Sequence, residues 1–169
     1  DLGSSLVSDR GDRQKLLEFG RVFDHLPVGF CVFDADLRYV YANEALAALD
    51  GGSSQNHLGR TIFEILPHVA PLVMPALHQV METGEPVVGG VVEAETQAAP
   101  GEMRAFQYTY TVIKVADHAA IGVSCLVQDV TDQRQAQVAL EKSDGRLELS
   151  LDAASIGTWT WNLIDGTHF

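Results

Sequence analysis

An abrupt change of hydrophobic period near residue 129 limits the folds that this chain can adopt. Over residues 119–128, bulky and small side chains alternate, which predicts a β-strand with two unlike faces. We expect the bulky face to point at the core and the small face to let a helix lie close to the sheet. These faces hold Ile121, Val123, Cys125 and Val127 on the bulky side, and Ala120, Gly122 and Ser124 on the small side. At Asp129-Val130-Thr131 helix-forming residues take over, so the strand must lead directly into an outgoing helix.

The residues before this strand predict further strands. Two short apolar runs at 28–33 and 38–42 are separated by an acidic turn, a pattern typical of a β-hairpin. Because the first run is apolar without alternation, we expect both faces of its strand to be covered. Two longer strands are predicted at 87–94 and 103–114, each bounded by turn residues.

Helical periodicity and capping residues place the helices. An amphipathic helix is predicted at 14–26 and a second long helix at 69–83. Because Pro75 lies inside the second pattern, that helix either kinks at Pro75 or begins there. Asn43 is a good N-cap for a short helix, and Thr61 and Glu64 have the spacing of a capping box. The predicted fold class is therefore α+β: a five-stranded antiparallel sheet with short helices on one face, flanked by an N-terminal amphipathic helix and a C-terminal helix.

Composition excludes several classes of function. The chain has 169 residues, is 46% hydrophobic and carries a net charge of −12. It lacks the clustered Lys and Arg that neutralise phosphates, so we expect no nucleic-acid partner. No apolar run approaches the ~20 residues that span a bilayer, so we expect no membrane insertion by this segment. Cys31 and Cys125 are typical of buried, reduced thiols in a cytoplasmic protein, with a redox pair as the alternative. No metal-ligand spacing, nucleotide-binding glycine loop or catalytic nucleophile motif is present.

Four stretches, spread over about residues 19–133, resemble a PAS domain. They are 26–29, 41–43, 58–61 and 122–134. The last contains Asp129-Val130-Thr131-Asp132-Gln133-Arg134, which is similar to the motif by which the final strand of a PAS domain feeds its signalling helix. The resemblance implies a non-catalytic sensory module with a signal hinge at Asp129, Thr131 and Arg134, where Asp129 and Arg134 could form an ion pair. The alternative is that these residues merely end a strand and cap a helix.

The end of the chain resembles the entry into a second PAS domain. Gly157 and Asn162 repeat the spacing of Gly29 and Asp34, although a local C-terminal hairpin is the alternative. The predicted organisation is a disordered leader at 1–13, the amphipathic helix at 14–26, the PAS core at 27–130, a signalling helix at 131–155 and the truncated start of a second PAS domain at 156–169.

The resemblance also implies a ligand cavity between the sheet and the helices. Its lining candidates are Phe30 or Val32, Phe63, Leu77, Tyr108, Tyr110 and Val123, although a filled core would contain the same residues. Flavin chemistry of the Cys-adduct type is excluded, because the corresponding stretch 59–64 has no Cys. Haem is disfavoured, because His57, His68 and His78 are predicted at the surface. The cofactor is therefore unknown.

The flanking helices suggest how the module transmits a signal. We expect a homodimer whose contacts include Leu16, Phe19, Phe23, Leu140 and Leu147. The resemblance implies a downstream output domain in the same chain, such as a histidine kinase or a diguanylate cyclase. Two alternatives remain open for the module: a structural dimerisation spacer without ligand, and a haem-binding sensor.

Overall fold

The computed structural model describes residues 2–114 and 120–143. It divides into one unit that ends at Val130 and a second that begins at Thr131, and each is described by itself. The elements of the first unit are α1 (Leu2–Arg21), β1 (Gly29–Asp34), β2 (Tyr39–Ala42), α2 (Glu44–Asp50), α3 (Ser54–His57), α4 (Ile62–Ile65), α5 (Ala70–Thr83), β3 (Val87–Ala94), β4 (Arg104–Lys114) and β5 (Ala120–Asp129). Among the described residues, no helix combines the length and the apolar character needed to cross a bilayer.

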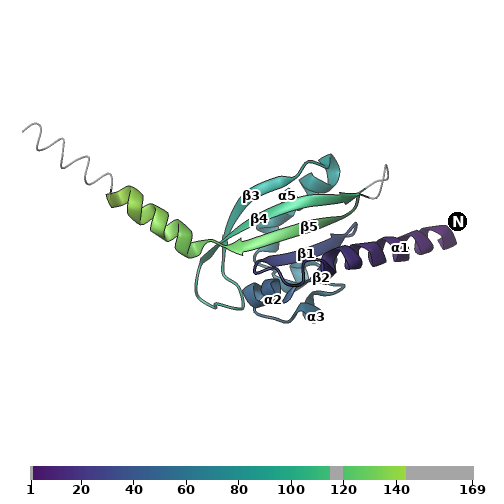
Figure 1. Cartoon of the computed structure of the whole chain (residues 1–169), viewed down its shortest axis with the longest axis horizontal. Coiled ribbons are helices and arrows are strands. Elements are labelled where there is room, and N and C mark those ends of the chain that lie inside the picture. The colour runs from purple at the N-terminus through teal and green to yellow at the C-terminus, as the bar shows by residue number, and fades with distance from the viewer. Residues whose placement is uncertain (1, 115–119, 144–169) are drawn as a thin grey trace, which may run out of the picture. The chain divides into compact units, whose positions relative to one another are not determined.

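The strands form a five-stranded antiparallel sheet in the order β2-β1-β5-β4-β3 (Figure 1). This arrangement confirms the predicted fold class. The last strand of the sequence, β5, lies in the centre and pairs with the first strand, β1, so that Cys31 stands opposite Cys125. The first and last strands of the predicted core are therefore neighbours in the sheet.

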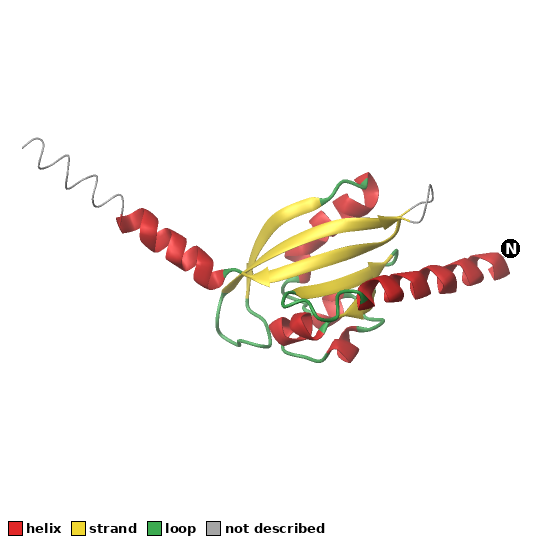
Figure 2. Ribbon diagram, viewed as in Figure 1, coloured by secondary structure: helices red, strands yellow, loops and turns green. Residues whose placement is uncertain are grey.

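Both faces of β1 are covered, as its unbroken apolar sequence predicted. Helices α2, α4 and α5 cover one face of the sheet, whereas α1 lies on the other (Figures 1 and 2). We call the first layer the pocket-side core and the second the α1-side core. The pocket-side core takes Cys31 and Phe33 from β1, and the α1-side core takes Phe30 and Val32. Alternate side chains of β1 thus belong to two separate hydrophobic clusters.

A glycine on β5 lets α1 approach the sheet. A Cβ atom at Gly122 would lie 2.2 Å from the carbonyl oxygen of Phe33 and 3.1 Å from Leu16 of α1. The predicted role of the small face of this strand, as a seat for a helix, is therefore confirmed. Ile121 differs from the prediction, because it packs against the α1-side core rather than the pocket-side core.

The N-terminal helix has other bounds than predicted. It runs from Leu2 to Arg21, so it includes most of the expected leader and stops before residue 26. Turns follow it, with Phe23 N–H donating to the carbonyl of Gly20 at 2.9 Å. The Asn43 side-chain amide donates to the carbonyls of Val28 (2.9 Å) and, more weakly, Phe23 (3.5 Å), which holds this connection in a turn that leads into β1.

The predicted helix boundaries on the pocket side are confirmed. Asn43 caps α2, since its side-chain oxygen accepts from Leu46 N–H at 2.9 Å and also from Phe30 N–H at 2.9 Å. The Glu64 carboxylate accepts from Thr61 N–H at 2.8 Å, as expected of a capping box. The helix α5 ends at Gly84, whose φ of 74° favours glycine.

The second unit begins with a helix at 131–143. This agrees with the predicted signalling helix for as far as the structure describes it. The remaining residues, 144–169, lie outside the described part of the chain. Leu147 and the expected start of a second PAS domain therefore stay predictions.

Candidate functional site

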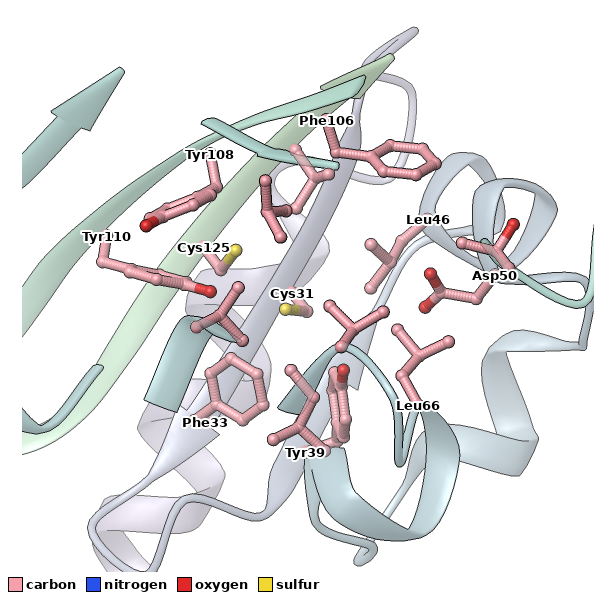
Figure 3. Close-up of a pocket in the computed structure, with 16 residues that line it drawn as sticks. Cys31, Phe33, Tyr39, Leu46, Asp50, Leu66, Phe106, Tyr108, Tyr110 and Cys125 are labelled. Atoms are coloured by element: carbon pink, nitrogen blue, oxygen red, sulfur yellow. The ribbon is translucent and has the colours of Figure 1, made fainter. Parts of the chain in front are cut away.

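A cavity of about 50 Å³ lies between the sheet and the helices of the pocket-side core (Figure 3). Its walls are mostly apolar and aromatic, with side chains from all five strands on one side and from α2, α4 and α5 on the other. The sheet contributes Cys31, Phe33, Tyr39, Val92, Phe106, Tyr108, Tyr110, Cys125 and Val127. A cavity of ~150 Å³ accepts benzene, so side chains must move here before a one-ring molecule can enter.

The predicted lining residues fall into three groups. Tyr108 and Tyr110 line the cavity as expected. Leu77 and Val123 are buried in the pocket-side core but do not line the cavity. Three candidates lie elsewhere: Phe63 is half exposed on α4, and Phe30 and Val32 point to the α1-side core.

Strand register explains why Cys31 and Phe33 of β1, which were not predicted as lining residues, lie in the cavity wall. Cys31 and Phe33 pair with Cys125 and Val123, which the prediction had placed on the bulky, core-facing side of β5. Residues opposite each other in a sheet point to the same face. Knowing that β1 and β5 are neighbours would therefore have selected Cys31 and Phe33 in place of Phe30 and Val32.

The two cysteines of the pocket face each other across adjacent strands. Both are free and buried, as predicted from their apolar surroundings. Burial raises the pKa of the Cys31 thiol well above its ordinary value, and the hydrogen bond with Cys125 raises it further. The Cys31 thiol is therefore protonated near neutral pH and is a poor nucleophile.

A buried acid–histidine pair forms one end of the cavity. The prediction that His57 lies at the surface is wrong. Asp50 is the last residue of α2 and lines the cavity, whereas His57 is 1% exposed. His57 Nε2 lies 3.0 Å from Asp50 Oδ2, and Nδ1 lies 2.9 Å from the Ser53 carbonyl oxygen. The sequence signal for this pair was the position of Asp50, which lies four residues after Leu46 and therefore on the buried face of α2.

Burial and pairing shift the pKa values of this pair. Burial raises the pKa of the Asp50 carboxyl, and the hydrogen bond to His57 opposes that shift. Burial alone lowers the pKa of His57, but the hydrogen bonds to Asp50 and Ser53 outweigh it, so the pKa of His57 is raised. The pair therefore retains a proton that an isolated histidine would release.

Tyrosine hydroxyls add polar groups to the wall. Figure 3 shows the hydroxyls of Tyr39 and Tyr110 turned toward the cavity, as is the Asp50 carboxylate. Burial raises the pKa values of both tyrosines, so both hydroxyls stay protonated and can donate. The apolar cavity thus has a few hydrogen-bonding groups on its walls.

The predicted hinge begins at a fixed corner. At the end of β5, the Asp129 carboxylate lies 3.3 Å from Arg104 of β4, and Val130 N–H donates to the carbonyl of Ala105 at 2.8 Å. Val127 lines the cavity two residues before Asp129. The predicted pair between Asp129 and Arg134, and the roles of Thr131 and Arg134, stay predictions.

The predicted dimer residues have unlike surroundings. Leu16 is 1% exposed and belongs to the α1-side core of its own chain, which corrects its assignment as a dimer contact. Phe23 packs against Phe30 of its own chain, with ring centroids 4.3 Å apart. Phe19 and Leu140 expose 39% and 61% of their surface and could still meet a partner chain.

The three candidate histidines, all within the described part of the chain, are not placed as haem ligands. Both ring nitrogens of His57 are engaged with Asp50 and Ser53, and His68 and His78 are exposed. Within the described residues, no three His, Cys, Asp or Glu side chains gather into a metal site.

The comparisons with known proteins agree with this architecture. The family model described as PAS fold matches residues 23–135, so the chain belongs to the PAS fold family. The expected resemblance to PAS domains is therefore confirmed. A PAS domain is a sensory domain and is not itself catalytic. A search of the curated proteins finds no match.

Solved structures with the same fold include receptors and an isolated domain. VqmA of Vibrio cholerae, solved in a complex with ligand and DNA, matches at 28% identity with a TM-score of 0.58, over 69% of this chain and 52% of VqmA. A structure described as VqmA bound to DPO matches at 27% identity with a TM-score of 0.56, over 67% and 57% of the two chains. The PAS domain of a Colwellia psychrerythraea protein, at 14% identity and a TM-score of 0.56 over 68% and 96% of the chains, shows the fold alone. The match thus spans about half the length of VqmA.

Proposed function

We propose that this chain is a sensory and signal-transmission domain that binds a small molecule in its cavity. The cavity carries the proposal, because its apolar and aromatic walls hold a few convergent polar groups, a combination typical of small-molecule sites. The similarity to VqmA, whose structures are described with a ligand and with DPO, supports it. The binding module itself performs no chemistry.

The connection from the cavity to the outgoing helix supports a relay. Val127 lines the cavity, and β5 ends two residues later at Asp129. The Arg104–Asp129 ion pair and the Val130–Ala105 hydrogen bond fix this corner to β4. A ligand that displaces Val127 would shift the start of the helix at 131–143, which would carry the change to an output domain.

The partners of the whole protein are part of the proposal. A homodimer remains the expected assembly, with Phe19 and Leu140 as exposed apolar contacts. A histidine kinase or a diguanylate cyclase remains the expected output. The expectation of no nucleic-acid partner rested on the charge of this chain, and it finds no support in VqmA, which is described with DNA.

A ligand-free dimerisation spacer is the second candidate. The observation in its favour is the size of the cavity, since about 50 Å³ lies well below the ~300–1,000 Å³ of typical ligand pockets. The two functions differ in whether a molecule enters the pocket-side core.

Native mass spectrometry and thermal unfolding with DPO test the proposal. Val127→Phe fills the cavity and should reduce binding at least tenfold, whereas Val91→Phe, on an exposed position of β3, should leave it unchanged. Ligand addition should change hydrogen exchange of the amides at 131–143 if the relay operates. A chain that carries no bound mass after purification and is not stabilised by DPO would support the spacer instead.

A further inference from the structure

The wall of the cavity carries a charged group at one end. Among the described residues that line the cavity, Asp50 is the one with a charged side chain. It is 7% exposed, and Figure 3 shows its carboxylate turned into the cavity. A carboxylate in such a place must be paired, because an isolated buried charge is costly.

The hydrogen bonds of His57 fix the protons of this pair. The Ser53 carbonyl oxygen can only accept, so His57 Nδ1 carries a proton and donates it. A second proton lies between His57 Nε2 and Asp50 Oδ2, which are 3.0 Å apart. Whichever of the two atoms holds this proton, the other carboxylate oxygen, Oδ1, keeps its lone pairs.

The Oδ1 atom of Asp50 is available to a molecule in the cavity. Among the residues that the structure describes, none donates a hydrogen bond to it. An N–H or O–H group of a bound molecule would supply the missing donor, and bonds to charged acceptors are the stronger ones. The described lining residues include no Lys or Arg, so nothing on the wall compensates a bound anion.

We propose that Asp50 is the recognition residue of this pocket. Its Oδ1 accepts a hydrogen bond from the N–H or O–H group of a neutral or cationic one-ring molecule, and the pocket rejects anions. His57 is a positioning residue, because it holds Oδ2 and turns Oδ1 toward the ligand. The inference rests on the proposed function, that the cavity binds a small molecule.

Probes of equal ring size test this recognition with the full chain. Aniline offers a neutral N–H donor, toluene offers none, benzoate is an anion and benzylammonium is a cation. Calorimetry near neutral pH should show aniline binding roughly 10- to 100-fold tighter than toluene, as a hydrogen bond to a charged acceptor implies. Benzylammonium should also bind more tightly than toluene, whereas benzoate should bind more weakly than toluene.

Two variants of Asp50 separate hydrogen bonding from charge. Asp50→Asn keeps an acceptor oxygen and can donate its NH₂ to His57 Nε2, so it should keep the preference for aniline and lose that for benzylammonium. Asp50→Leu removes the acceptor and should bind aniline and toluene equally. Glu44→Gln is the control, since it removes a charge from the same helix outside the cavity wall. Thermal unfolding of each variant reports whether it folds, and the Asn variant decides the question if the Leu variant does not.

The outcomes distinguish this inference from the proposed function. If toluene binds as tightly as aniline to the unmodified chain, Asp50 is not the recognition residue, although the cavity still binds small molecules. Tight binding of benzoate would overturn the inference in the same way. If none of the four probes binds, the inference falls, whereas the response to DPO and to Val127→Phe still decides the proposed function.

Discussion

The two faces of the sheet differ in how closely they are packed. On the α1 side, Phe30 packs against Phe23, and the Tyr41 hydroxyl donates to Asp24, so these contacts fix the turn after α1 to the sheet. On the pocket side, the hydroxyls of Tyr39 and Tyr110 face a cavity (Figure 3). One face of the sheet is therefore closely packed, whereas the other leaves a cavity. Polar groups with partners inside the chain stabilise the fold, and polar groups that face a cavity can recognise a ligand.

The α1-side core should tolerate added side-chain volume less well than the pocket-side core. Gly122→Val should lower the free energy of unfolding by at least about 3 kcal/mol, because its side chain would overlap the Phe33 carbonyl and Leu16. Urea unfolding measures this loss. Gly52→Ala is the control, since a Cβ atom there meets nothing closer than 4.0 Å, and it should change stability little. A stable Gly122→Val variant would show that α1 does not pack against β5.

The next largest loss of stability is expected on substitution of Asn43, which joins β1 to α2. Asn43 accepts hydrogen bonds from Leu46 N–H and Phe30 N–H, and it donates to the carbonyl of Val28. Asn43→Ala leaves these buried groups without partners and should cost about 2–3 kcal/mol. Asn43→Asp keeps the accepting oxygen and should lose less in the same unfolding experiment. Equal losses in both variants would mean that the amide donor matters more than the cap.

Removal of a tyrosine hydroxyl should have different effects on the stability of the two faces of the sheet. Tyr41→Phe removes a hydroxyl that is bonded to Asp24 and should cost about 1 kcal/mol. Tyr39→Phe removes a hydroxyl that faces the cavity and should change the free energy of unfolding by less than about 0.5 kcal/mol in either direction. A larger loss for Tyr39→Phe than for Tyr41→Phe would contradict the assignment of the two faces.

The smallest effect is a dependence of stability on pH that belongs to the pocket side. His57 has a raised pKa when folded, whereas its ordinary value is 6.5. Hydrogen bonds to Asp50 and Ser53 raise it against burial and the charge of Arg60. The folded chain therefore keeps a proton that the unfolded chain releases above pH 6.5. The stabilisation is complete below that pH and is lost as pH rises through the folded pKa.

Thermal unfolding between pH 6 and 9 measures this loss. His57→Gln should remove the part of the pH dependence that His57 contributes. The raised pKa of Asp50 acts with the same sign at lower pH, since the folded chain again holds the proton longer than the unfolded chain. If stability rises with pH between 6.5 and 8 in the unmodified chain but not in His57→Gln, the pair does not share a proton as proposed.

The sequence by itself determined the elements, their caps and the family. Alternation in β5, the capping box at Thr61 and Glu64 and the cap at Asn43 depend on neighbouring residues, so local patterns were enough to predict them. Tertiary structure decided which residues reach the cavity. Cys31 and Phe33 line it because β1 pairs with β5 in one register, and a shift by one residue would have presented Phe30 and Val32 instead. The meeting of Asp50 with His57 likewise depends on how α2 and α3 fold back on each other, which no periodicity records.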